Sequence, residues 1–348
     1  MEKNVLRLLI SGSVDDGKSS LLGRLLYETK SVFKDQLNAA EEESKKYGTQ
    51  GKQTDLALLV DGLQDEREQG ITIDVAYRYF ETKYKKYIVA DTPGHKQYTR
   101  NMATGASNSE VALIIVDATK GVTEQTRLHA FIVSLFKLEK IIILVNKMDL
   151  INFNKKKYEK IKKDFGIYLN KINLIQNEFI PISALTGENV VKKSKKMRWY
   201  KGESLLSSLD TINLKKEELS DFRMPIQWVN RTSSFRGYSG IVTSGTIKKG
   251  DKIIIAPSNK TAKIKNLFLS RKNSLIAQKN HSITLQLSEQ LDVARGDCVS
   301  SILNPVKSYN LISAKLFWID KKPLILNKKY KIQFIANSSE ADINFISY

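Results

Sequence analysis

The fold is decided by one stretch near the start of the chain, Gly12-Ser13-Val14-Asp15-Asp16-Gly17-Lys18-Ser19. It matches the pattern G-x-x-x-x-G-K-[ST], and it lies between a predicted strand at residues 5–11 and a predicted helix at residues 18–27. In such a turn the glycines let the backbone wrap around phosphates, and the start of the helix adds positive potential. We therefore predict a phosphate-binding loop in which Lys18 reaches the β- and γ-phosphates and Ser19 ligates Mg²⁺.

Short apolar runs alternate with amphipathic segments through the first part of the chain, which is typical of βαβ units. The runs predict buried strands at residues 5–11, 87–91, 111–117, 141–146 and 179–183, and an alternating edge strand at 75–81. The amphipathic segments predict helices at residues 18–27, 125–136 and 155–169. The predicted fold class is an α/β domain with a mostly parallel, doubly wound sheet, whose ligands bind at the carboxyl ends of the strands.

Three further motifs follow predicted strands. The first of these motifs is Asp91-Thr92-Pro93-Gly94-His95. Its Asp91 carboxylate can hold Mg²⁺ through a water molecule, and the backbone amide of Gly94 can sense a γ-phosphate. The second is Asn146-Lys147-Met148-Asp149. The Asp149 carboxylate can accept hydrogen bonds from the two N–H donors on one edge of guanine, and adenine has no such pair of donors. Ser183-Ala184-Leu185 can present an amide to the guanine O6. Together with residues 12–20, Ser20 included, these motifs predict a site for GTP or GDP.

The segment Gly70-Ile71-Thr72-Ile73, followed by the Asp91 motif, resembles the translational GTPases of the elongation factor Tu and 1-alpha type. The resemblance implies that Thr72 closes on Mg²⁺ and the γ-phosphate, and that His95 positions the attacking water behind an apolar gate of Val14 and Ile71. It therefore implies Lys18, Thr72 and His95 as catalytic residues, and Ser19, Thr72 and Asp91 as the residues around the metal ion.

A closer resemblance is to the large, GTPase subunits of bacterial sulfate adenylyltransferase. It is carried by Asp16, where elongation factors usually have His, and by residues 61–80, 97–107, 229–231, 235–240 and 294–297. It implies a cytoplasmic heterodimer with a small, ATP-pyrophosphatase-type subunit. There GTP hydrolysis drives the synthesis of adenosine 5′-phosphosulfate and pyrophosphate from ATP and sulfate, a step of sulfate assimilation. The alternative from another class is an elongation-factor-type GTPase that binds aminoacyl-tRNA.

Beyond the first domain, predicted at residues 1–219, the runs become short and rich in β-branched residues. They predict a β-barrel at residues 220–304, with strands at 226–230, 240–247, 252–256, 262–269, 282–287 and 297–303. From residue 305 to 348 we expect the start of a second β-barrel, with strands at 312–318 and 330–336, that is truncated relative to the family.

Composition narrows the possibilities further. The 348 residues are 41% hydrophobic, enough for packed cores, and carry a formal net charge of +19. The excess is mostly Lys, which forms fewer paired hydrogen bonds to phosphates and bases than Arg does, so we expect no nucleic-acid partner. The Lys-rich residues 151–201 are expected to be a solvated face, and the alternative is a docking surface for an acidic protein or RNA. Apolar runs are too short to span a membrane, and the single cysteine, Cys298, excludes a disulfide within the chain. Trp199, Trp228 and Trp318 are expected to pack in a core or between domains.

Overall fold

The structure is a computed structural model that describes residues 4–32, 56–60, 75–95, 98–136, 138–175, 177–213, 221–270, 272–314, 316–318, 320 and 322–346, together with positions 35, 37, 38, 40, 42 and 44. The chain forms two compact units, residues 1–214 and 215–348. Each unit has its own hydrophobic core.

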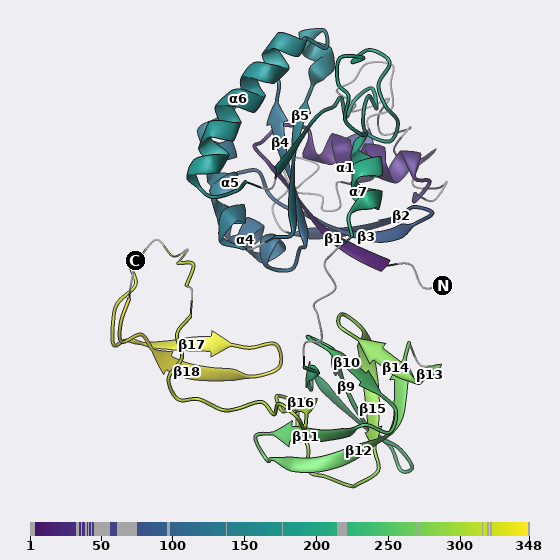
Figure 1. The fold of residues 1–348 in the computed structure, drawn as a ribbon, viewed down its shortest axis with the longest axis vertical. Coiled ribbons are helices and arrows are strands. Elements are labelled where there is room, and N and C mark those ends of the chain that lie inside the picture. Colours follow the sequence, from purple (N-terminus) through teal and green to yellow (C-terminus); the bar gives the residue numbers. More distant parts are fainter. Residues whose placement is uncertain are drawn as a thin grey trace. The chain divides into compact units, whose positions relative to one another are not determined.

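A six-stranded sheet forms the centre of the first unit (Figure 1). Its order is β2-β3-β1-β4-β5-β6, and only β2 runs antiparallel to its neighbour. The strands are β1 (Asn4–Gly12), β2 (Ala76–Glu81), β3 (Lys85–Asp91), β4 (Val111–Asp117), β5 (Lys140–Asn146) and β6 (Asn177–Pro181). Every residue of β4 is buried, as expected for a strand covered on both faces. The predicted mostly parallel sheet and its edge strand are confirmed.

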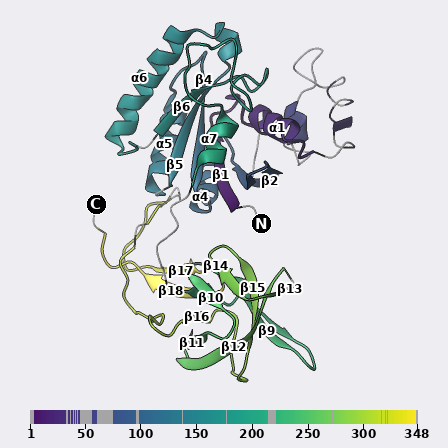
Figure 2. The ribbon, with the colours of Figure 1, turned by 45° about the vertical axis from the view of Figure 1, so that its right-hand side comes forward.

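Helices cover both faces of this sheet, with α5 and α6 on one side and α1 and α7 on the other (Figures 1 and 2). The described helices are α1 (Lys18–Glu28), α4 (Thr99–Ser107), α5 (Glu124–Leu135), α6 (Lys155–Lys171) and α7 (Leu205–Thr211), with two 3₁₀ turns, η1 (Leu56–Leu59) and η3 (Met148–Ile151). Thr123 begins α5 with a capping box, and Asn154 begins α6 by accepting a hydrogen bond from Lys157 N. These caps explain why both helices start within a residue of the predicted position.

Sequence patterning gave no prediction for α7, because its seven residues are too few to display a helical period. Tertiary contacts hold it: Leu205 and Leu209 join the core shared with α1. The buried Lys85 ammonium donates to the carbonyl oxygens of Leu209 and Ile212, which satisfies the end of the helix. Lys85 therefore fastens α7 to β3.

An antiparallel sheet of eight strands dominates the second unit, in the order β7-β16-β11-β12-β15-β9-β8 with β13 paired to β12. Its strands are β7 (Arg223–Pro225), β8 (Trp228–Arg231), β9 (Arg236–Ile241), β11 (Lys252–Ala256), β12 (Lys260–Leu269), β13 (Lys272–Ser274), β15 (Ser282–Leu287) and β16 (Cys298–Ser301). The two end strands, β7 and β8, are consecutive in the chain, so residues 223–231 bring the ends of the sheet together. Two ribbons complete the unit, β10 (Thr246–Lys248) with β14 (Ile276–Gln278), and β17 (Lys329–Gln333) with β18 (Ser338–Asp342).

Three details of the second unit differ from the prediction. The run at 240–247 is two strands, because Gly245 takes a left-handed φ of 70° between β9 and β10. The strand predicted at 312–318 is wrong for the described residues, where Ile312 and Leu316 are exposed and the backbone has no ladder to join. Trp228 is 62% exposed, so it does not pack in the core of its own unit, and its packing between domains stays a prediction.

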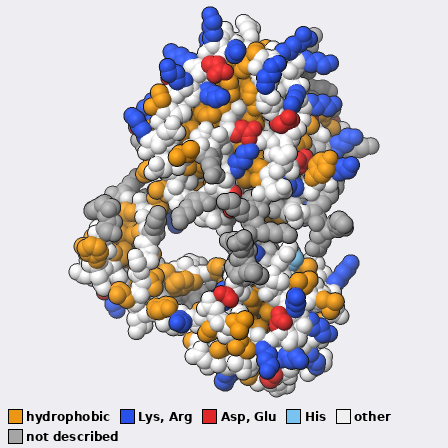
Figure 3. Space-filling view, viewed as in Figure 1, with side chains coloured by type: hydrophobic (Ala, Val, Ile, Leu, Met, Phe, Trp, Pro, Cys, Tyr) orange, Lys and Arg blue, Asp and Glu red, His pale blue; other side chains and the backbone are white. Residues whose placement is uncertain are grey.

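The charge of the first unit is carried on its surface. All seven lysines of α6 are exposed, while its buried face holds Tyr158, Ile161, Phe165 and Leu169. In Figure 3, Lys and Arg side chains surround the upper part of this unit. The Lys-rich residues of α6 are thus on a solvent-exposed face, as expected.

Candidate nucleotide-binding site

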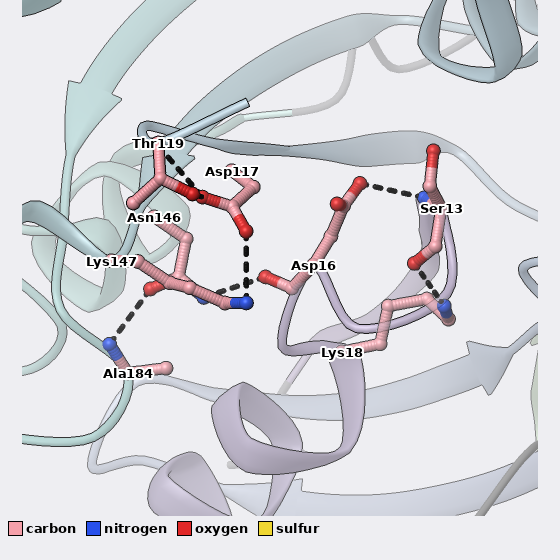
Figure 4. Close-up of polar contacts among 8 residues, drawn as sticks. All are labelled: Ser13, Asp16, Lys18, Asp117, Thr119, Asn146, Lys147 and Ala184. Carbon is pink, nitrogen blue, oxygen red and sulfur yellow. Dashed lines mark hydrogen bonds and ion pairs between the residues drawn. The ribbon is translucent and has the colours of Figure 1, made fainter. Parts of the chain in front are cut away.

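The phosphate-binding loop joins β1 to α1 as predicted. Gly17, the residue before α1, has a φ of 94°, and a Cβ built on it would lie 2.4 Å from Asn146 Nδ2. Glycine is therefore required there both by backbone conformation and by space. The Lys18 ammonium folds back over the loop and donates to the carbonyl oxygens of Gly12, at 3.0 Å, and Ser13, at 2.9 Å (Figure 4).

The Asp16 side chain bonds to the backbone of its own loop. Its carboxylate accepts a hydrogen bond of 2.7 Å from Ser13 N, and the residue is buried. Burial raises the pKa of Asp16, while the Ser13 amide and the Lys18 charge oppose that shift. The residue that distinguishes this loop from the elongation-factor pattern therefore shapes the loop through a hydrogen bond that the sequence alone did not reveal.

The motif at residues 91–95 lies directly against the phosphate-binding loop. Asp91 ends β3, is buried, and its charge is close enough to Lys18 to oppose the lowering of the Lys18 pKa that burial causes. Thr92 Oγ1 donates to Ile10 O at 2.7 Å, which joins the motif to β1. A Cβ on Gly94 would lie 2.5 Å from Lys18 Nζ and 2.8 Å from Gly12 O, so the Gly94 backbone contacts the loop.

Asn146 connects two loops at the other end of the site. Its Nδ2 donates to Asp16 O at 2.8 Å, and its Oδ1 accepts from Ala184 N at 2.9 Å (Figure 4). The loop that begins at Ser183 is further held by Arg24 of α1, which donates to Ala184 O at 3.1 Å and to Leu185 O. The phosphate-binding loop, the loop at residues 146–149 and the loop at residues 183–185 are thus bonded into one network.

Lys147 is held in place by a residue that sequence reasoning missed. It has a left-handed φ of 60°, and its ammonium lies 2.8 Å from Asp117 Oδ2 at the end of β4. Burial opposes ionisation of Asp117, but the Lys147 ammonium and the Thr119 hydroxyl and amide together lower its pKa. A signal existed, since Asp117 is an acid at the carboxyl end of a fully buried strand, as Asp91 is.

Asp149 lies in η3, between the buried residues Met148 and Ile151. Its Oδ1 is buried, and it has no hydrogen-bond partner within the described part of the chain. A buried carboxylate oxygen without a hydrogen-bond donor costs free energy in a folded protein. Its presence therefore indicates that a ligand supplies the donor.

All of the predicted site residues belong to the described residues except Thr72 and Ile71 of the apolar gate, which lie outside them. Asp15 and His95 are exposed, and the others are buried or half-buried. The fold brings together Lys18, Asp91, Gly94, Asn146, Lys147 and Ala184 through the contacts given above. Within the described part of the chain the His95 ring makes no hydrogen bond or ion pair, and its role stays a prediction, as does the role of Thr72.

Comparison with known proteins agrees with these motifs. The profile of the family described as Elongation factor Tu GTP binding domain matches residues 3–220. Sulfate adenylyltransferase subunit 1 of Sulfurovum sp. is 46% identical over 99% of this chain and 74% of its own length. The protein of the same name from Pseudoalteromonas atlantica is 47% identical over 100% of this chain and 74% of its own length.

The chain belongs to the sulfate adenylyltransferase subunit 1 family. Its first unit is a GTP-binding domain of the elongation factor Tu type, and the family resemblance drawn from the sequence is confirmed. The chain spans about three quarters of the length of these relatives. The relatives favour this family over the alternative of an aminoacyl-tRNA-binding elongation factor.

Solved structures match the fold of this family member at lower identity. The GTPase-like domain of S. cerevisiae Ski7, bound to GDP and inorganic phosphate, is 20% identical with a TM-score of 0.59, covering 86% of this chain and 76% of that one. A bacterial selenocysteine-specific elongation factor is 19% identical with a TM-score of 0.54, covering 99% of this chain and 52% of that one. Both likenesses concern the fold alone. Among the described residues, no helix is long and apolar enough to cross a membrane.

Proposed function

We propose that this chain hydrolyses GTP with Mg²⁺ at the site described above, and that hydrolysis drives the synthesis of adenosine 5′-phosphosulfate and pyrophosphate from ATP and sulfate by a small partner subunit. The observation that carries the proposal is the meeting of the motif loops, which Asn146, Lys18 and Gly94 join at the carboxyl edge of the sheet. The relatives' name, sulfate adenylyltransferase subunit 1, supports the adenylyl-transfer reaction and a further subunit. The coupling to GTP hydrolysis and the small size of that subunit come from the sequence resemblance.

At the phosphate end, Lys18 and the amides of residues 13–18 bind the β- and γ-phosphates. Ser19, Asp91 and Thr72 are the residues that would hold Mg²⁺, and their hydroxyl and carboxylate oxygens are ligands that this ion prefers. When bound, Mg²⁺ neutralises charge that builds up on the phosphate oxygens. The buried carboxylate of Asp91 beside the Lys18 loop fits this arrangement, because a cation would offset its burial.

At the base end, Asp149 accepts the two N–H donors of guanine, and the stem of Lys147 lies along the ring. The buried, unpartnered Oδ1 of Asp149 supports this role, because guanine offers the donor that the described protein residues do not. Asn146 keeps this loop and the Ala184 amide in register with the phosphate-binding loop. These bonds hold the loop at residues 183–185, which is proposed to present a backbone amide to the guanine O6.

At the γ-phosphate, His95 would orient the attacking water. The water oxygen bonds to the γ-phosphorus while the bond from that phosphorus to the bridging oxygen of GDP breaks, so GDP and inorganic phosphate form and the water proton passes to solvent. Thr72 would supply a hydroxyl ligand to Mg²⁺. GTP hydrolysis can drive the uphill reaction only if the GTP and GDP states differ in affinity for the reaction states of the partner. His95 is exposed, as expected for a side chain that docking of the partner, rather than contacts within its own unit, moves into its working position.

The test is to measure GDP release from GTP, and pyrophosphate release from ATP, by the chain alone and with the small subunit, ATP and sulfate. We expect GTP hydrolysis to rise only when all three are added. Lys18→Ala should abolish both activities. Lys86→Ala, which removes an exposed lysine at the far end of β3, should leave them unchanged. Full GTP hydrolysis by the isolated chain, without any response to the other components, would contradict the proposal.

A further inference from the structure

The ends of the large sheet in the second unit meet over only part of their length. At Ile226 the two sides are joined, because Gly296 N donates to Ile226 O at 2.9 Å and Ile226 N donates to Asp297 O at 2.8 Å. Beyond that point residues 228–232 and residues 292–294 separate around a cavity of about 510 Å³. These two described segments share no backbone hydrogen bond. We call this opening the β8 seam.

The backbone of β8 offers hydrogen-bonding groups to the seam. Thr232 N donates to Phe235 O at 2.8 Å, so these two residues form a hydrogen-bonded pair. The register of β8 and β9 then shows which other pairs exchange backbone hydrogen bonds. Because bonded positions alternate in an antiparallel pair, the backbone groups of Val229 and Arg231 point away from β9. Such an edge can accept one additional extended strand.

The charge beside the seam specifies the occupant. Arg231 and Arg236 lie directly opposite each other in the ladder, an arrangement in which two like charges repel. Asp292 is their counter-ion at 4.0 and 3.8 Å, but its side chain is 96% exposed. The Nε and Nη2 atoms of Arg236 are buried and make no hydrogen bond within the described residues. A second carboxylate, placed against the accessible parts of the Arg231 and Arg236 guanidinium groups, would relieve the repulsion between them.

Two further observations converge on this place. Trp228 stands at the rim of the seam with its side chain largely exposed, ready to cover an apolar group. Of the segments that carry the sequence resemblance in this unit, residues 229–231 and Ala294 line the seam, and Arg236 lies opposite Arg231 in the ladder. Nucleotide binding explains none of them.

We propose that an acidic, extended segment of the partner subunit docks in the β8 seam, adding a strand to β8 and placing a carboxylate between Arg231 and Arg236. The identity of the partner rests on the proposed function, whereas the site rests on the geometry of the second unit. Main-chain bonds to Val229 and Arg231 supply affinity, and the arginine pair selects an acidic sequence.

The experiment measures binding of the purified small subunit to the full chain by calorimetry. Arg231→Gln/Arg236→Gln should weaken binding at least 10-fold. Lys252→Gln/Lys265→Gln removes two exposed charges from β11 and β12 and should have no effect. Hydrogen exchange on the wild-type complex provides a readout that needs no variant: residues 226–232 should gain protection when the small subunit binds.

Each result decides the proposal. Wild-type affinity in the arginine variant, or unchanged exchange at residues 226–232, overturns the docking site while leaving the proposed function intact if GTP hydrolysis still responds to the partner. Failure of the wild-type chain to bind the small subunit overturns both. Self-association of the wild-type chain that the arginine variant abolishes would assign the seam to a second copy and overturn docking of the partner.

Discussion

The side-chain amide of Asn146 donates a hydrogen bond to the backbone carbonyl of Asp16, 2.8 Å away. The same side chain accepts a hydrogen bond from Ala184 N on its other side. One buried residue at the end of β5 therefore positions the phosphate-binding loop and the last motif loop together. The geometry of the whole site depends on this relationship, because no other described side chain joins these two loops directly.

Asn146→Ala should damage both stability and nucleotide retention. It leaves the backbone carbonyl of Asp16 and the backbone amide of Ala184 without their hydrogen-bond partner. Each buried group left in this way costs about 1–3 kcal/mol. We expect a comparable loss in the unfolding free energy of the first unit and faster GDP release, measured with a fluorescent GDP analogue. Asn189→Ala is the matched control, since Asn189 also joins two backbone segments, at Pro181 O and Ser194 N. It should lower stability similarly, and equally fast GDP release from both variants would argue against a special role for Asn146.

Asp149→Asn should change the base that the site accepts. An amide presents one donor and one acceptor, so it opposes the guanine 2-amino group but matches the carbonyl of xanthine. We expect GTP affinity to fall by roughly 100-fold or more while XTP affinity rises. Competition binding with GTP, XTP and ATP measures this. Asp164→Asn, at an exposed position of α6, should leave all three affinities unchanged. Retained GTP preference in Asp149→Asn would remove Asp149 from the base site.

Gly94→Ala should impair the phosphate end selectively. The added methyl group would lie 2.5 Å from Lys18 Nζ, so either the ammonium or the loop after β3 must move. We expect GTP hydrolysis to fall at least 10-fold, with a larger loss of affinity for GTP than for GDP. Gly166→Ala is the control, since a Cβ there meets nothing within 4 Å, and in the middle of α6 it should stabilise by about 0.5–1 kcal/mol. Equal effects on GTP and GDP binding would count against a γ-phosphate role.

His129 should make the first unit sensitive to mild acid. Burial, with a smaller contribution from the Lys18 charge, lowers its pKa to about 3, and its Nδ1 is buried without a partner among the described residues. The unfolded chain binds a proton below about pH 6.5 and the folded chain does not, so stability falls as the pH drops. The loss amounts to about 2 kcal/mol between pH 6.5 and 5.

Trp199 is the only tryptophan of residues 1–214, so its fluorescence can follow unfolding of this unit in a Trp228→Phe/Trp318→Phe background. His129→Gln should remove about 2 kcal/mol from the difference in unfolding free energy between pH 6.5 and 5. The comparison between the two chains isolates His129 from Asp16, whose raised pKa acts in the opposite direction. His281→Gln, in the second unit, should keep the wild-type pH dependence. An unchanged pH dependence in His129→Gln would show that the ring is protonated as readily in the folded state as in the unfolded one.

Local patterns predicted much of the first unit. Nearly unbroken apolar runs identified β1, β3, β4 and β5, because a strand covered on both faces holds few polar residues along its length. The second unit was harder, since its strands are short and half exposed. The split at Gly245 and the unstructured backbone around Ile312 depend on which strands find partners, and a partner is not a property of the local sequence.

The sequence by itself determined the order of the motifs, the carboxyl ends of strands on which they lie, and the chemical groups they offer to a guanine nucleotide. Spacing and residue type suffice for this, because each motif is a continuous loop after a strand. Only the tertiary structure decided that Asn146 bonds to Asp16, that Asp117 holds Lys147, and that the barrel opens between residues 228–232 and 292–294. These contacts join residues far apart in the chain, and burial and hydrogen-bond geometry fix them only after the sheets have formed.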